Sequence, residues 1–78
     1  MNMYYLDIVI VILSRIILKS EKYKSNLEVL MNEFKEMKTK DLNEEDETHI
    51  LDYYFLLLKI NNYGGNHNVD DMLSPMFD

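Results

Sequence analysis

The sequence predicts an all-α protein: a long N-terminal helix, an antiparallel second helix and a short tail, assembled as a homo-oligomeric helical bundle. The first observation is a heptad seam from Leu6 to Met37, where alternating steps of three and four residues meet apolar side chains everywhere except at Ser20. The second is that no Pro or Gly interrupts this seam. The third is size, because a chain of 78 residues without Cys has a marginal core and is usually stabilised by a partner.

The first helix is predicted to span residues 3–38. A β-branched run at residues 8–12 locally favours a strand, but the heptad spacing continues through it and no turn residues flank it. The second half of this helix is amphipathic. The first half, residues 4–18, is apolar on almost every side, and its narrow polar strip consists of Asp7, Ser14 and Arg15. A helix of this kind must be covered nearly all round.

The second helix is predicted to follow a turn at residues 39–43 and to span residues 44–62. Asp41 or Asn43 serves as its N-cap, because each is followed three residues later by a carboxylate in the pattern of a capping box. The two glycines beyond this helix end it, since Gly is the usual left-handed residue after a helix C-terminus.

In such a hairpin the second helix is too short to cover residues 4–18, which project about 25 Å beyond it. A second copy is the favoured cover, so residues 1–63 form a hairpin and oligomerisation domain and residues 64–78 an acidic–hydrophobic tail. In one alternative the helix breaks near Ser20, which then N-caps a helix of a three-helix bundle. In the other, the tail packs back over the apolar half. The predicted oligomer interface consists of Leu6, Val9, Leu13, Ile16, Ile17 and Tyr23.

The net charge of −6 is concentrated in the second half of the chain. Residues 1–40 carry seven Lys or Arg and five Asp or Glu, whereas residues 41–78 carry one Lys and nine Asp or Glu. A basic footprint is absent, which argues against direct nucleic-acid binding and favours a protein partner with a basic or hydrophobic groove. The acidic run at residues 44–47 also has a simpler role, because carboxylates at a helix N-terminus complement the helix macrodipole.

The tail mixes carboxylates with large apolar side chains, a pattern typical of segments that fold on binding a partner. It resembles an acidic transactivation segment, which implies apolar anchors that enter a partner's groove. The alternative is a tail pinned to its own bundle by its large apolar side chains. The predicted partner-binding residues are Glu44, Glu45, Asp46, Glu47, Asp70, Asp71, Met72, Leu73 and Phe77.

No catalytic, metal or cofactor site is predicted. Asp46 and His49 share a helix face and resemble half of a di-iron bundle site, but the chain offers no second pair of this kind. No Gly-rich phosphate loop and no recognisable Ser–His motif occurs. The clean apolar run from Ile8 to Leu13 is far shorter than the roughly 20 residues of a transmembrane helix, and no signal-peptide pattern surrounds it. A cytoplasmic protein is expected, with a nuclear location open in a eukaryotic host.

We therefore expect a small non-enzymatic regulator or inhibitor that acts by protein–protein binding. Its small size and its Asn-, Ile- and Lys-rich composition suit a viral or mobile-element accessory protein. Two other classes stay open. One is an acidic nucleic-acid mimic that blocks a DNA- or RNA-handling protein. The other is a binder of a small ligand or metal at the oligomer interface.

Overall fold

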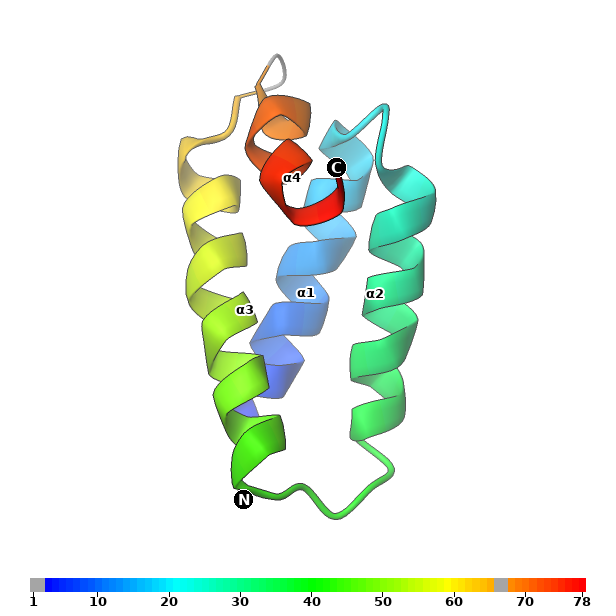
Figure 1. Cartoon of the computed structure of the whole chain (residues 1–78), viewed down its shortest axis with the longest axis vertical. Helices are drawn as coiled ribbons and strands as arrows, with labels where there is room; N and C mark the ends of the chain where they lie inside the picture. Colours follow the sequence, from blue (N-terminus) through cyan, green and yellow to red (C-terminus); the bar gives the residue numbers. More distant parts are fainter. Residues whose placement is uncertain (1–2, 66–67) are drawn as a thin grey trace.

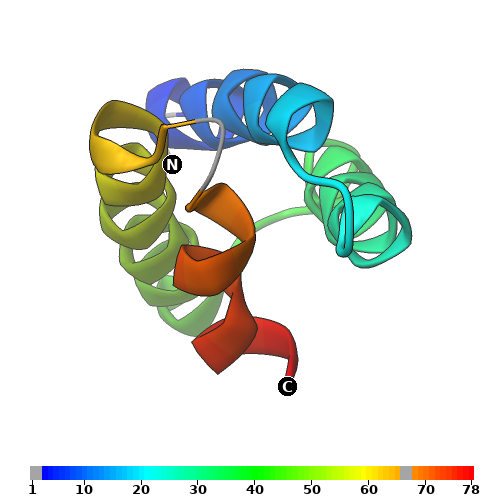
Figure 2. The same ribbon diagram turned by 90° about the horizontal axis from the view of Figure 1, so that it is seen from above.

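The computed structural model describes residues 3–65 and 68–78, and these form an all-α bundle, which confirms the all-α part of the predicted fold. Residues 1, 2, 66 and 67, which fall within the two predicted domains, lie outside the described residues. α1 contacts both α2 and α3, and α4 packs against α3 and covers one end of the open side of the bundle (Figures 1 and 2). The helices are α1 (Tyr4–Lys19), α2 (Lys24–Met37), α3 (Glu44–Tyr63) and α4 (Val69–Phe77).

The chain reverses direction at Ser20, so the single helix predicted over residues 3–38 is wrong. Ser20 has an extended backbone with φ −81° and ψ 139°, which ends α1. Its hydroxyl accepts a hydrogen bond from the Tyr23 N–H at 3.0 Å and donates one to Asp70 Oδ1 at 2.6 Å. The N-cap of α2 is Tyr23, without a side-chain capping bond, so the N-cap role that one alternative gave to Ser20 is wrong, and the Ser20 hydroxyl instead holds the turn before α2. The break near Ser20 that this alternative placed in the first helix is confirmed, and Figure 1 shows α2 returning beside α1.

The core lies between the inward faces of α1, α2 and α3, and α4 closes it at one end. The seam residues from Leu6 to Phe34 are buried, and Ile50, Leu57 and Ile60 of α3 pack against them. The chain's own helices therefore cover the surface for which a second copy was predicted, and these side chains are not available to another molecule. Of the predicted interface, the buried residues are Leu6, Val9, Leu13, Ile16 and Tyr23, and the half-buried one is Ile17.

The predicted capping box is present at the start of α3, with Asn43 as the N-cap. Asn43 Oδ1 accepts a hydrogen bond from the Asp46 N–H at 2.9 Å, and Asp46 Oδ2 accepts one from the Asn43 N–H at 3.1 Å. Two backbone donors are satisfied reciprocally in this way. Asp46, which was predicted to contact a partner, therefore holds the end of its own helix.

Gly64, directly after α3, lies in a close packing contact that leaves no room for a side chain. The left-handed backbone predicted there is wrong. Its backbone is extended, with φ −82° and ψ 109°. A Cβ atom on Gly64 would lie 2.5 Å from the Ile60 carbonyl oxygen and 2.8 Å from Val69 Cγ2. The missing side chain thus lets α4 approach the end of α3. At Gly65 a Cβ atom would fit, with its nearest contact at 3.6 Å.

The tail packs back onto the bundle as α4, chiefly against α3 at one end. The apolar half of the first helix is covered mainly by α2 and α3, and not by the tail as the other alternative had it. Val69 and Leu73 are buried, and Met72 and Phe77 are half-buried against the core. Leu73, predicted as an anchor for a partner, therefore belongs to the core of its own chain. None of the helices formed by the described residues is long and apolar enough to cross a membrane.

Candidate interaction surfaces

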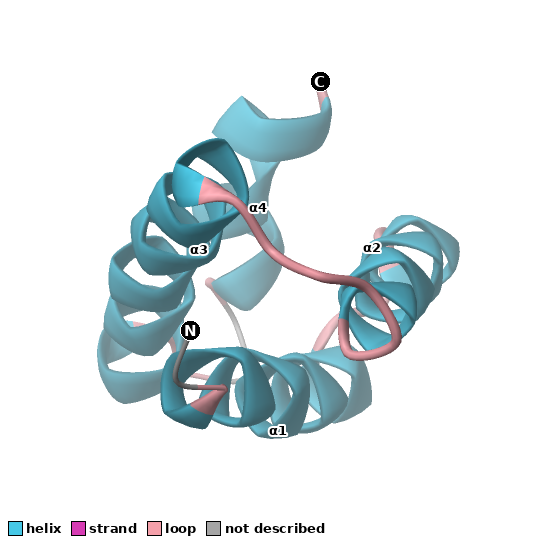
Figure 3. Cartoon of the chain, turned by 90° about the horizontal axis from the view of Figure 1, so that it is seen from below, coloured by secondary structure: helices cyan, strands magenta, loops and turns pink. Residues whose placement is uncertain are grey.

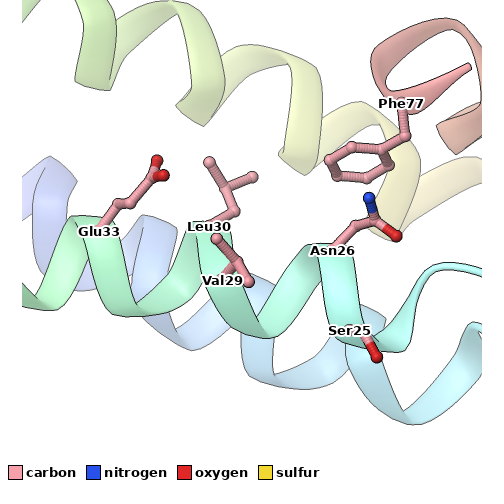
Figure 4. A pocket seen from close by; sticks show the side chains of 6 residues that line it. All are labelled: Ser25, Asn26, Val29, Leu30, Glu33 and Phe77. Atoms are coloured by element: carbon pink, nitrogen blue, oxygen red, sulfur yellow. The ribbon is translucent and has the colours of Figure 1, made fainter.

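A shallow groove lies between α2 and α4 (Figure 4). Val29 is 59% exposed there although it is apolar, and its neighbour Leu30 is buried. Figure 4 shows Phe77 reaching from α4 toward α2, with Glu33 farther along α2. The groove thus combines apolar side chains with polar ones at its edge. Its volume is about 370 Å³, and it is lined by Ser25, Asn26, Val29, Leu30, Glu33 and the predicted partner-binding residue Phe77.

Asp70, near the start of α4, ties this helix to the turn between α1 and α2. Its carboxylate accepts hydrogen bonds from the Ser20 hydroxyl at 2.6 Å, from the Glu21 N–H at 3.2 Å and from the Lys22 N–H at 3.1 Å. The Ser20 hydroxyl is the main cause that lowers the pKa of Asp70, and the two backbone donors add to it. Asp70, predicted as a partner contact, is therefore an internal acceptor.

Asp78 makes a second tie between α4 and the same turn. Its carboxylate accepts hydrogen bonds from the Tyr23 hydroxyl and from Lys22 Nζ, the latter at 3.1 Å. The Tyr23 hydroxyl and then the Lys22 ammonium lower the pKa of Asp78, and Asp78 in turn raises the pKa of Lys22. The Tyr23 ring lies 5.4 Å from the Phe77 ring, measured between centroids. The two ties therefore position Phe77 at the wall of the groove.

The acidic run at residues 44–47 lies at the opposite end of the molecule from α4 (Figure 1). Its three glutamates are exposed, whereas Asp46 is engaged in the capping box. The other predicted contacts, Asp71 and Met72, lie on α4, so the structure does not bring the predicted binding residues together. The glutamates have no cationic partner among the described residues, whose ion pairs are Lys22–Asp78 and Lys38–Asp7.

The outward face of α1 exposes apolar side chains that lie outside the predicted oligomer interface, beside the polar strip of this helix. Tyr4, Val11 and Leu18 are 52%, 51% and 80% exposed, and they follow one another at intervals of seven residues. Asp7 and Arg15 lie between them on the same side of the helix. The signal was present in the sequence as a heptad repeat on the side of the helix opposite the predicted seam.

Four aromatic rings form a row that joins α1 to α3. The ring centroids are 5.3 Å apart for Tyr4 and Tyr5, 5.0 Å for Tyr5 and Tyr54, and 5.2 Å for Tyr54 and Phe55. All three contacts are edge to face, the arrangement that aromatic quadrupoles favour. The adjacent tyrosines in the sequence were the signal for this row, which fixes the N-terminal end of α1 on α3.

The residues considered for a metal site have another role. His49 stacks on Phe34 at 5.6 Å and meets Tyr53 edge to face at 4.8 Å, between ring centroids. In the part of the chain that the structure describes, no group of three or more His, Cys, Asp or Glu could hold a metal ion. The geometry defines a small helical bundle with apolar surfaces exposed on α1 and between α2 and α4. No protein-family model, curated protein or solved structure matches this chain.

Proposed function

We propose that this chain is a small non-enzymatic interaction protein that binds another protein through the groove between α2 and α4. The observation that carries this proposal is the groove itself, with Val29 exposed on one side and Phe77 held on the other. Apolar clefts with a few polar groups at the edge suit single side chains inserted by a partner. Because the ties of α4 already hold Phe77 in place, binding requires little ordering of the chain.

The partner that we propose presents an apolar or aromatic anchor beside a Lys or Arg. The anchor enters between Val29 and Phe77, and the cation meets Glu33 at the edge of the groove. The net charge of −6 and the unpaired glutamates of the acidic run attract a basic protein over a longer distance, which speeds association more than it tightens binding. By occupying a surface of its partner, the protein acts as a regulator or inhibitor.

Peptides selected from a random display library against the full chain test this proposal. We expect Val29→Asp to weaken the selected peptides at least about tenfold in calorimetric titrations, because a carboxylate replaces part of the apolar wall. Val11→Asp is the matched control, since Val11 is a half-exposed valine on α1, and it leaves peptide binding unchanged. Circular dichroism verifies that both variants are folded. Peptides that bind Val29→Asp as tightly as the native chain contradict binding in the groove.

A second candidate is an acidic mimic of nucleic acid that occupies the basic site of a DNA- or RNA-handling protein. It is supported by the exposed, unpaired glutamates at the start of α3. Reversal of Glu44, Glu45 and Glu47 to Lys then abolishes retention of such a partner on the immobilised chain, while peptides in the groove still bind. Retention that is equal on the native and the charge-reversed chain removes this candidate.

A further inference from the structure

We propose that two copies of this chain associate through the outward face of α1, with the two α1 helices antiparallel about a twofold axis at Val11. This inference is independent of the groove. Tyr4, Val11 and Leu18 each expose about half or more of their surface, and their seven-residue spacing aligns them in one stripe along the helix. The stripe is interrupted by the exposed Asp7, Ser14 and Arg15, so it combines apolar side chains with charges of both signs, as the rim and core of an association surface do.

The charges on this face select the antiparallel orientation. With Val11 opposite its counterpart, Tyr4 of one copy faces Leu18 of the other, and Asp7 faces Arg15 at both ends of the contact. A parallel pair would instead place Asp7 against Asp7 and Arg15 against Arg15, which is repulsive. Arg15 has no ion pair within the described residues, whereas Asp7 is bound by Lys38 at 2.7 Å. The second copy therefore supplies Arg15 with a carboxylate and extends an existing ion pair.

The distribution of charge favours a second copy as the occupant of this face. α1 carries Asp7, Arg15 and Lys19, so its outward side is nearly neutral and self-complementary. The acidic faces of α3 in two copies would repel each other instead. Figures 2 and 3 show α1 as the middle helix of an arc with α2 and α3, and none of the other described helices lies along its outer side.

The size of the contact predicts a weak dimer. α1 has 16 residues and is therefore about 24 Å long. One pair of helices of this length buries less than the roughly 1,200 Å² of a standard interface. Both copies also carry a net charge of −6. We therefore expect a dissociation constant on the order of 0.1 mM, so the dimer is populated only in concentrated solution.

Single-cysteine variants give a direct test, because the chain contains no Cys. Val11→Cys places a thiol on the twofold axis, next to its counterpart, at the distance of about 4–7 Å between Cα atoms that a disulfide requires. Under mild oxidation it forms covalent dimers much faster than Val29→Cys, a valine of similar exposure on α2. A mixture of Tyr4→Cys and Leu18→Cys gives mainly mixed dimers. Equal cross-linking of the two valine variants, or a preference for like pairs in the mixture, overturns the proposal.

Sedimentation equilibrium of the full chain supplies a second readout. Arg15→Asp raises the dissociation constant at least about tenfold, because Asp7 then faces a carboxylate. Lys24→Asp makes the same change in net charge on α2 and leaves the constant unchanged. Circular dichroism verifies the fold of each variant. A native chain that is monomeric at about 1 mM, or equal effects of Arg15→Asp and Lys24→Asp, refutes the dimer.

Discussion

Replacement of Leu73 by Ala measures how firmly α4 is packed on the bundle. Leu73 is fully buried, with 0% of its surface exposed, although it belongs to the segment that the sequence predicted as a partner-binding tail. Truncation of a buried Leu to Ala costs about 2.7–5 kcal/mol, depending on how far the neighbours close the cavity. α4 is a helix of nine residues at one end of the bundle and can shift to fill part of the space. We therefore expect a loss near the lower end, about 3 kcal/mol.

This loss is large relative to the whole molecule. A domain of 78 residues has a free energy of unfolding of about 4–12 kcal/mol. A loss of about 3 kcal/mol lowers the melting temperature of so small a domain by about 12–24 °C. Leu18→Ala is the matched control, because Leu18 is 80% exposed within α1. Both changes have the same effect on helix propensity, and an exposed truncation stays within about 0.5 kcal/mol of the native chain.

Urea unfolding followed by circular dichroism gives both free energies at low micromolar protein, where the proposed dimer is not populated. Amide exchange at Lys22, whose N–H bonds to Asp70, reports separately on the release of α4. We expect Leu73→Ala to lose global stability and to exchange faster at this amide. If Leu73→Ala is no less stable than Leu18→Ala, buried side chains do not dock α4 and the placement of Leu73 in the core is refuted.

Three further perturbations probe the contacts that shape the fold. Gly64→Ala lowers the free energy of unfolding in urea by about 1–3 kcal/mol, because the new Cβ collides with its neighbours. Gly65→Ala is the control and changes it by no more than about 0.5 kcal/mol. Equal effects of the two variants would contradict the close contact at Gly64. Asp70→Asn makes the free energy of unfolding depend less on pH in acid. The pKa of Asp70 in the folded chain lies below its ordinary value of 3.8, so the carboxylate stabilises the fold above that pH, and this stabilisation is lost as the pH falls through the folded pKa. Urea midpoints measured from neutral pH into acid check this, and Asp71→Asn, a change at an exposed carboxylate, should keep the native profile. Asn43→Ala removes the cap of α3 and costs about 0.5–2 kcal/mol, and a stability equal to that of the native chain would show that the cap contributes nothing.

The core and the fold class could be predicted from the sequence because helical periodicity is a local property. Leu6, Leu27 and Ile50 occupy seam positions and are buried, although the predicted topology was wrong. A helix turns the same face inward whichever neighbour covers it, so an error in the direction of the chain leaves the list of buried residues nearly unchanged. The pattern of apolar residues therefore fixes burial before it fixes the path of the chain.

The break at Ser20 could not be selected from local signals, because its partner is distant in the sequence. A Ser on a helical seam is compatible both with a continuous helix and with an N-cap. Here the extended backbone is held by the bond to Asp70, fifty positions later. Asp70 was predicted to contact a partner for the same reason, because the sequence does not distinguish a solvated carboxylate in an acidic tail from one that is hydrogen-bonded to the chain itself. The groove depends on both residues, because Phe77 reaches it only when α4 is docked.

Two valines on α1 separate folding from association. Val9 is fully buried and Val11 is 51% exposed, although they are only two positions apart. α2 and α3 cover the inward side of α1 and its flanks, whereas Val11 lies on the outward side among exposed polar and apolar residues. Val9→Asp unfolds the chain, because an unpaired charge in the core costs several kcal/mol, comparable with the total stability.

Val11→Asp keeps the native circular dichroism and urea midpoint but abolishes the proposed dimer in sedimentation equilibrium, because two carboxylates then meet at the twofold axis. A folded Val9→Asp would show that the inward face of α1 is not part of the core. A dimer that survives Val11→Asp would show that the outward face is not the contact between copies. The two variants together therefore test whether one helix, apolar on both sides, serves the core with one face and a second molecule with the other.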